Sequence, residues 1–333
     1  MKLGILDYEQ IDEGSNARQA LQETVELAQL ADALGYERFW MAEHHDVPAF
    51  ASSSPELIMM HVANETKRIR IGSGGVMLPH YSPLKVAENF RVLEAIHPNR
   101  IDLGIGNTIG TPIVNRTLNE HKTSKLNYEQ SITDLTVYLT DQVQEDHRFH
   151  GITANPVIPT VPEMWALSMS IRTAKIAAKL GIGYPYGHFL GGMDRLEVGK
   201  KAVETYHHEF RPSPFQQEPK VSLATFVVVA ETTEEAESYR ETLDLWLLGN
   251  NHFSQWNTFP SVDTARNYDY TEKEKATVQQ NRKRMVVGDL KSVSEQLTEL
   301  ITELNADEIL AVPLMPEILA RKKGIELLAE AFQ

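Results

Sequence analysis

Short apolar runs alternate with longer amphipathic stretches along the chain. The first run, residues 3–6, precedes a stretch from about residue 17 to residue 34 in which apolar side chains recur every three or four positions, as in a helix packed on a core. Gly35 stands where such a helix commonly ends, and a second apolar run covers residues 38–41. This order of strand, helix and strand, with short connections, predicts a parallel sheet with right-handed crossovers.

Six further strands are predicted, each followed by a helical pattern: 69–72, 101–105, 164–167, 182–186, 221–229 and 308–312. The segment 182–186 is the weakest of them, because Gly183 and Pro185 are unusual inside a central strand. With this strand the chain has eight strand–helix units and forms a closed (β/α)8 TIM barrel, whereas without it the sheet would be open and doubly wound. We expect an α/β fold of the barrel type. No linker or repeat divides the chain, so we expect one domain over residues 1–333.

The least regular stretch is residues 250–275, which shows no helical periodicity but carries five aromatic residues: Phe253, Trp256, Phe259, Tyr268 and Tyr270. A loop of this length inside a compact domain is usually functional or disordered, and the aromatic content argues against disorder. We interpret it as an insertion after the seventh strand that covers the barrel mouth. A packed surface insertion is the alternative.

Charge and composition narrow the function. The chain has 32 Lys and Arg against 46 Asp and Glu, a net charge of −14, which disfavours nucleic acids and anionic membranes as partners. There is no cysteine, so redox chemistry requires a bound cofactor. The N-terminus lacks the apolar core of a signal peptide and no run of about 18 apolar residues occurs, so we expect a cytoplasmic protein.

Candidate site residues follow the predicted strands, because barrel active sites lie at the C-terminal strand ends. Glu43, His44 and His45 follow the second strand and include good metal ligands. Adjacent residues leaving a strand point to opposite sides, so His44 and His45 would not share one ion, and we expect no metal. For His44, a catalytic role and a role in holding the loop by hydrogen bonds are about equally supported by position alone.

Two other strand ends carry features typical of ligand sites. Gly74 and Gly75 follow the third strand, where glycine indicates either a close approach of a flat ligand or a simple bulge. Residues 168–173 open a helix directly after a strand, and the free amides there, with the hydroxyls of Ser170 and Thr173, would suit an anion. The same residues would also serve as ordinary helix caps.

Three segments resemble the bacterial luciferase-like monooxygenases: FWMAEHH at 39–45, RIRIGSGGVMLPHYSPLKVAENF at 68–90 and LEAIHPNRIDLGIG at 93–106. A looser similarity extends over nearly the whole chain. The resemblance implies a (β/α)8 barrel that binds flavin mononucleotide (FMN) at the C-terminal strand ends, with an inserted loop after the seventh strand. It further implies that reduced flavin, often supplied by a separate flavin reductase, and dioxygen oxidise a small organic substrate. Members of the family are commonly homodimers.

The resemblance also assigns roles. His44 matches the histidine that assists the chemistry, and Gly74 and Gly75 match small residues joined by a non-prolyl cis peptide against the flavin ring. The positions that hold the ribityl chain and phosphate correspond to Leu167, Ser170 and Thr173.

One departure concerns the phosphate. Where the family commonly has arginine after the fourth strand, this chain has Asn107, which loses a charge-assisted contact of about 1.5–3 kcal/mol unless Arg172 or Arg116 replaces it. Met169 in the phosphate-binding turn is a further departure. Two alternatives therefore stay open: a deazaflavin-dependent dehydrogenase, and a non-catalytic flavin-binding or partner subunit.

Overall fold

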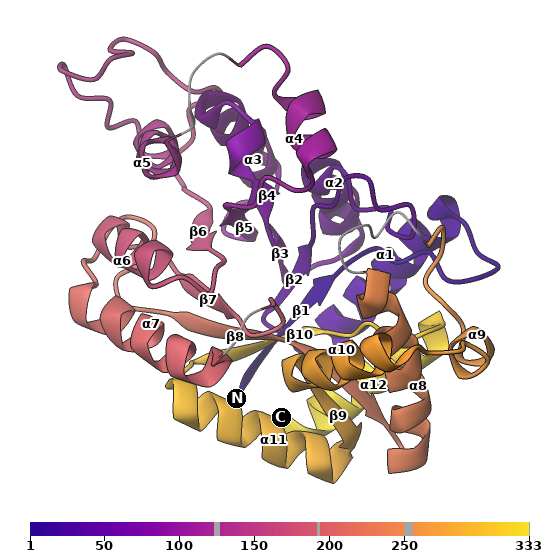
Figure 1. Cartoon of the computed structure of the whole chain (residues 1–333). Helices are drawn as coiled ribbons and strands as arrows, with labels where there is room; N and C mark the ends of the chain where they lie inside the picture. Colours follow the sequence, from indigo (N-terminus) through magenta and orange to yellow (C-terminus); the bar gives the residue numbers. More distant parts are fainter. Residues whose placement is uncertain (123–126, 192–193, 250–255, 333) are drawn as a thin grey trace.

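A computed structural model describes residues 1–122, 127–191, 194–249 and 256–332. All its paired strands are parallel and belong to one sheet (Figure 1). β1 lies between β2 and β10; beyond β2 follow β3, β5 and β6, and beyond β10 follow β8 and β7. The bounds of these strands are β1 Lys2–Asp7, β2 Arg38–Met41, β3 Arg70–Ser73, β5 Ile101–Gly106, β6 Glu163–Ala166, β7 Tyr184–Gly187, β8 Val221–Ala230 and β10 Glu308–Val312.

The two ends of this sheet meet, which closes the barrel. The amide of Ala166, the last residue of β6, donates to the carbonyl oxygen of Gly183 at 2.9 Å, and the amide of Gly183 donates to the carbonyl oxygen of Met164 at 2.9 Å. Two short strands extend the wall: β4 (Val76–Met77) pairs with the end of β5, and β9 (Met285–Asp289) pairs with the second half of β8. The predicted (β/α)8 barrel is thus confirmed.

Helices surround the barrel, and the chain termini lie close together (Figure 1), where the N-terminal amine donates to the carbonyl oxygen of Phe332 at 3.3 Å. Among the described helices, none is both long and apolar enough to cross a membrane. The helix bounds are α1 Ala17–Ala33, α2 Pro55–Glu65, α3 Pro83–Ile96, α4 Pro112–Leu118, α5 Tyr128–Leu139, α6 Ile171–Leu180, α7 Arg195–Glu209, α8 Thr233–Trp246, α9 Val262–Arg266, α10 Glu272–Asn281, α11 Leu290–Leu304 and α12 Ile318–Phe332.

The weakly predicted sixth strand is present as β7, although it begins at Tyr184 rather than at residue 182. Gly183, immediately before it, forms a bridge with Trp165, and a Cβ atom on this glycine would lie 2.1 Å from the Trp165 ring. Glycine therefore stands here because a buried tryptophan packs over the backbone. The features that weakened the prediction are a consequence of packing inside the barrel.

The insertion after β8, the seventh strand of the barrel, is more ordered than the sequence predicts. Residues 250–255, with Phe253, lie outside the described residues, but the expectation of no helix in the remainder is wrong, because α9 and the start of α10 fall there. Ser261 caps α9, and Thr271 forms a capping box with Glu274 at α10. Phe259 is fully buried, 5.8 Å from the ring of Trp246. The described part is therefore packed against the barrel, and that it covers the barrel mouth stays a prediction.

The N-terminal end of the barrel is filled by a buried ion cluster. Asp102 on β5 has no exposed surface and pairs with Arg38, the first residue of β2. It also accepts from Arg70 Nε at 2.7 Å and from Trp40 Nε1 at 2.9 Å. Burial opposes the ionisation of Asp102, but the guanidinium groups of Arg38 and Arg70 outweigh it and lower its pKa.

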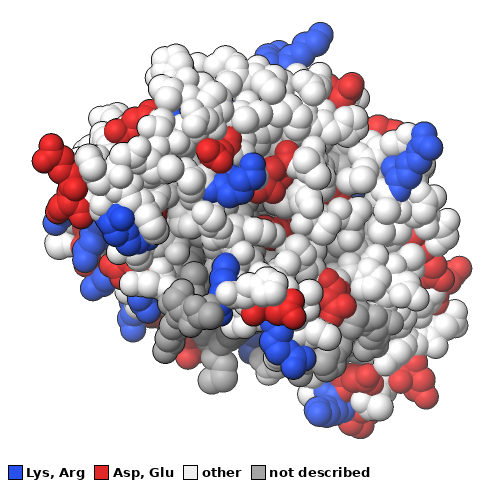
Figure 2. Space-filling view, turned by 90° about the horizontal axis from the view of Figure 1, so that it is seen from above, with Lys and Arg blue, Asp and Glu red and all other residues white. Residues whose placement is uncertain are grey.

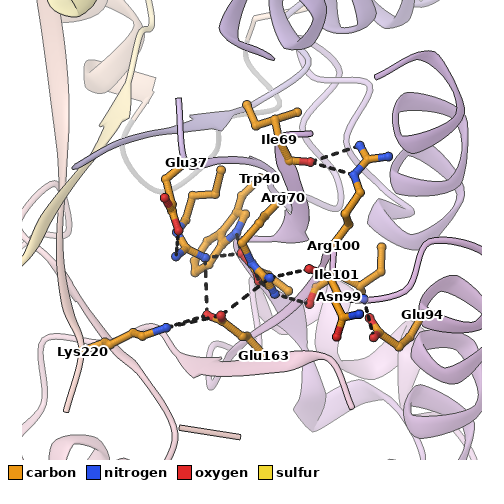
Figure 3. A network of polar contacts seen from close by, with 12 residues as sticks. Glu37, Trp40, Ile69, Arg70, Glu94, Asn99, Arg100, Ile101, Glu163 and Lys220 are labelled. Carbon is orange, nitrogen blue, oxygen red and sulfur yellow. Dashed lines mark hydrogen bonds and ion pairs between the residues drawn. The ribbon is translucent and has the colours of Figure 1, made fainter. Parts of the chain in front are cut away.

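Two glutamates complete this cluster. Glu308, at the start of β10, lies 2.9 Å from Arg38 Nε, and Glu163, at the start of β6, lies 3.7 Å from Arg70 Nη1. Figure 3 shows Glu163 between Arg70 and Lys220, whose Nζ is 3.3 Å away. The cluster joins strands on both sides of the barrel and closes its floor, so only the C-terminal end can open into a site.

Replacing the central carboxylate tests this floor. Asp102→Asn should lower the free energy of unfolding by about 3–5 kcal/mol, because two buried guanidinium groups lose part of their compensation. Urea unfolding followed by circular dichroism measures this loss. Lys291→Met is the control: the Lys291 side chain is 86% exposed, and losing its surface pair should cost less than about 1 kcal/mol. A cost below about 1 kcal/mol for Asp102→Asn would contradict the account.

Candidate functional site

The predicted site residues follow four neighbouring strands. His44 follows β2, Gly74 and Gly75 follow β3, Asn107 follows β5, and Leu167 follows β6. Because β2, β3, β5 and β6 are adjacent in the sheet, these residues lie along one half of the C-terminal rim. We call this the first half of the rim. The ends of β1, β7, β8 and β10 form the second half.

His44 is half-buried and held by the loop that follows it. Its Nδ1 lies 3.0 Å from the hydroxyl of Ser52, and its amide donates to the Ser52 carbonyl oxygen at 2.8 Å. The ring centroid is 4.6 Å from that of Tyr8, which follows β1. Burial and the neighbouring His45 lower the pKa of His44 to about 4. The imidazole is therefore neutral near pH 7, and its Nε2 has no hydrogen-bond partner among the described residues.

Glu43 and His45 turn away from His44, as the alternation along an extended chain predicts. Glu43 accepts from the amide of Met77 at 2.8 Å and from the hydroxyl of Tyr81 at 2.6 Å, and it lies 2.8 Å from His45 Nε2. These contacts tie the loop after β3 to the loop after β2. Within the described part of the chain, no group of three or more His, Asp or Glu side chains is arranged to hold a metal ion.

The peptide bond between Gly74 and Gly75 is cis. The amide of Gly74 donates to the carbonyl oxygen of Met41, at the end of β2, at 2.7 Å. A Cβ atom on Gly75 would lie 2.7 Å from the carbonyl oxygen of Gly104, and one on Gly74 would lie 2.5 Å from Leu6 Cδ1. Backbone packing thus requires glycine at position 75, whereas at position 74 the near atom is the end of a leucine side chain, which can move.

The start of α6 has a serine N-cap and an exposed arginine in its first turn. Ser170 caps the helix by accepting from the amide of Thr173 at 3.1 Å, and the buried Thr173 hydroxyl lies 3.5 Å from that of Ser170. The first turn carries no acidic residue. Arg172 in this turn is 76% exposed, and its ion pair within the described residues is a loose one of 3.7 Å with Glu129. The capping interpretation is therefore confirmed, and the first turn carries an exposed arginine and no acid of its own.

Asn107 and Leu167 complete the first half of the rim. Asn107 is exposed and makes no hydrogen bond to any described residue, and Leu167 is half-buried.

Figure 2 views the molecule from the side of α4, which follows β5. It shows mostly uncharged atoms around a hollow near the middle, with a small group of charged side chains beside it.

Two residues of the second half of the rim, Tyr8 and Glu9, are not among those predicted from the sequence. Tyr8 contacts His44 and lies 6.5 Å from the ring of Phe226 on β8. Glu9 is buried, and neither of its carboxylate oxygens has a described hydrogen-bond partner. Burial and the nearby Asp7 raise the pKa of Glu9 well above its ordinary value. The position of both residues directly after β1 was the available signal.

Comparison with known proteins is consistent with this geometry. Residues 1–308 match the model of the family described as luciferase-like monooxygenase. A Bacillus subtilis protein of unassigned function, YwcH, is 43% identical over 100% of this chain and 99% of its own length. The N-acetyl-S-alkylcysteine monooxygenase of the same organism is 32% identical over 99% of this chain and 98% of its own. The crystal structure of apo-MsnO8 is 34% identical, covers 99% of this chain and 98% of its own, and superposes with a TM-score of 0.83.

More distant structures share the fold. The oxygenating constituent of 3,6-diketocamphane monooxygenase from Pseudomonas putida, in complex with FMN, has a TM-score of 0.69 at 17% identity and covers 99% of this chain and 97% of its own. An F420-dependent secondary alcohol dehydrogenase has a TM-score of 0.68 at 12% identity, with coverage of 100% and 99%. From the match over residues 1–308 and the full-length relatives, we conclude that this chain belongs to the luciferase-like monooxygenase family.

Proposed function

We propose that this protein is a flavin-dependent monooxygenase that binds FMN along the first half of the rim and acts on a small organic substrate. One observation carries the proposal. A neutral histidine with a free Nε2 lies on the same half of the rim as the cis Gly74–Gly75 peptide and the acid-free start of α6. The flavin ring and the phosphate of FMN would each lie beside a suitable group on the first half of the rim.

The residues of the first half of the rim are suited to bind FMN. The amides at the start of α6, the Ser170 hydroxyl and the exposed Arg172 would hold the phosphate, since a helix start without acidic residues favours an anion. Leu167 and the Gly74–Gly75 segment would lie against the flat ring. Bound FMN, once reduced by a separate reductase, would supply the electrons with which dioxygen is activated.

The protein's own contribution is to orient and to move a proton. Ser52 holds the imidazole of His44 through Nδ1, which leaves Nε2 to donate or accept a proton. Because its pKa is about 4, His44 enters each cycle neutral at physiological pH. Tyr8, whose pKa burial raises, keeps its hydroxyl proton and packs beside His44.

The relatives support a monooxygenase more than a dehydrogenase. The N-acetyl-S-alkylcysteine monooxygenase spans the whole chain at 32% identity, whereas the F420-dependent dehydrogenase is only 12% identical. N-acetyl-S-alkylcysteines are therefore the first compounds to try as substrates. FMN and F420 are told apart directly, because each has its own absorption spectrum when bound.

His44→Gln tests the proton-transfer role. The variant should bind oxidised FMN within about twofold of the native affinity, but should oxidise N-acetyl-S-methylcysteine more slowly by on the order of 100-fold. Flavin fluorescence measures the binding, and product formation with reduced FMN and oxygen measures turnover. His121→Gln is the control, since the His121 side chain is 94% exposed and contacts none of the predicted site residues. Equal turnover of His44→Gln and native protein would contradict the role.

Asn107→Arg tests the phosphate site. A guanidinium there adds a charge-assisted contact of about 1.5–3 kcal/mol, so FMN affinity should rise at least about tenfold. Riboflavin, which has no phosphate, should bind the variant and the native chain equally. A gain in affinity for both FMN and riboflavin would show that the introduced arginine does not act on the phosphate. Absence of FMN binding by both proteins would contradict the proposed function itself.

A further inference from the structure

Two arginines on the second half of the rim have no acidic partner among the described residues. Arg284, directly before β9, donates from Nε to the carbonyl oxygen of Phe189 at 2.6 Å and from Nη1 to Asn281 Oδ1 at 3.0 Å. Arg195, at the start of α7, donates from Nε to the carbonyl oxygen of Leu190 at 3.1 Å. Both are half-buried, and within the described residues no carboxylate lies within 4.0 Å of either guanidinium.

Three other buried arginines in this protein are paired with acids, whereas the half-buried Arg100 is bound by the carbonyl oxygens of Ala63, Thr66 and Ile69. Arg91 lies 2.8 Å from Asp141, Arg321 lies 2.8 Å from Asp12, and Arg240 pairs with Asp244. Arg282, only two residues before Arg284, lies 3.0 Å from Asp244. Unlike Arg100, whose three guanidinium nitrogens all donate to described oxygens, Arg284 and Arg195 keep Nη donors without a described partner, so an anionic ligand could supply the missing charge.

The titratable groups described around this pair are neutral near pH 7 rather than negative. Burial lowers the pKa of Arg284 to about 10. Repulsion from Arg195 also lowers this pKa, whereas the hydroxyl of Tyr8 raises it. His188 lies near both arginines, and burial and their charges lower its pKa to about 4, so it is neutral near pH 7. Its Nδ1 lies 3.0 Å from the hydroxyl of Thr225 on β8. No carboxylate contributes to the pKa of Arg284, Arg195 or His188.

Aromatic rings connect this pair to the candidate reaction centre. The guanidinium of Arg284 lies 5.7 Å from the ring centroid of Phe226, which is 5.4 Å from that of Phe189 and 6.5 Å from that of Tyr8. The other side of Tyr8 contacts His44. A molecule with an anionic end at Arg284 and an apolar body along these rings would place its far end near His44.

From this arrangement we propose that Arg284 and Arg195 bind the carboxylate of the substrate, which is therefore a small organic acid with an apolar portion. The inference rests on the proposed function and specifies its substrate class. With a net charge of −14 the protein repels anions at long range, so an acid can bind only where cations are locally uncompensated. Two guanidinium groups whose Nη atoms have free donors, in a half-buried setting, provide such a place.

Binding of a matched acid and amide tests the proposal. Isothermal calorimetry on the full chain, with and without FMN, compares N-acetyl-S-methylcysteine with its carboxamide, which differs only in charge. The native protein should bind the acid at least about tenfold more tightly than the amide. Arg284→Gln and Arg195→Gln should each remove most of this preference and leave amide affinity unchanged. Arg284→Lys should keep part of it, since the charge remains but the fork geometry is lost.

Lys283→Gln is the matched control, because it removes the same charge from the adjacent, exposed position. It should alter neither affinity, and thermal unfolding checks that every variant is folded. Equal affinity of native protein for acid and amide, or no acid binding up to about 10 mM, would overturn the proposal. So would a loss of FMN affinity in Arg284→Gln with riboflavin affinity unchanged, which would assign the arginines to the cofactor phosphate. FMN binding without acid preference would leave the proposed function standing.

Discussion

The buried pairing of Asp102 with Arg38 and Arg70 holds the strands of the barrel in register. It lies at the N-terminal ends of the strands and, through Glu163 and Glu308, joins β2, β3, β5, β6 and β10. Charges this deep need geometrically matched partners, so the cluster stabilises only one register of the strands. Because it fills the floor, the opposite rim is where loops can diverge and polar groups can face a ligand.

The rim divides into two halves with different chemistry. The first half offers a cis glycine pair, a helix start without acids and a neutral histidine, which together suit a flat, phosphate-bearing cofactor. The second half offers aromatic rings and two arginines without acidic partners, which suit an organic acid. Tyr8 stands where the halves meet and contacts His44, so both ligands would converge on this histidine.

Much of the scaffold could be predicted because it follows from local patterning. The strands at 38–41 and 308–312 have the predicted bounds, and the first helix ends one residue before the predicted position. The short helices α9 and α10 could not be predicted from periodicity, because caps at Ser261 and Thr271 rather than an apolar stripe define them. Arg284 could not be recognised either, since its lack of an acidic partner arises only when β8, β9 and the turn after β7 meet.

A crystal structure of the chain with FMN tests whether a flavin occupies the first half of the rim. We expect electron density for the phosphate at the start of α6, beside Ser170 and Arg172, and for the ring against Gly74 and Gly75. Density for FMN elsewhere, or a first half of the rim filled by the protein's own side chains, would contradict this expectation.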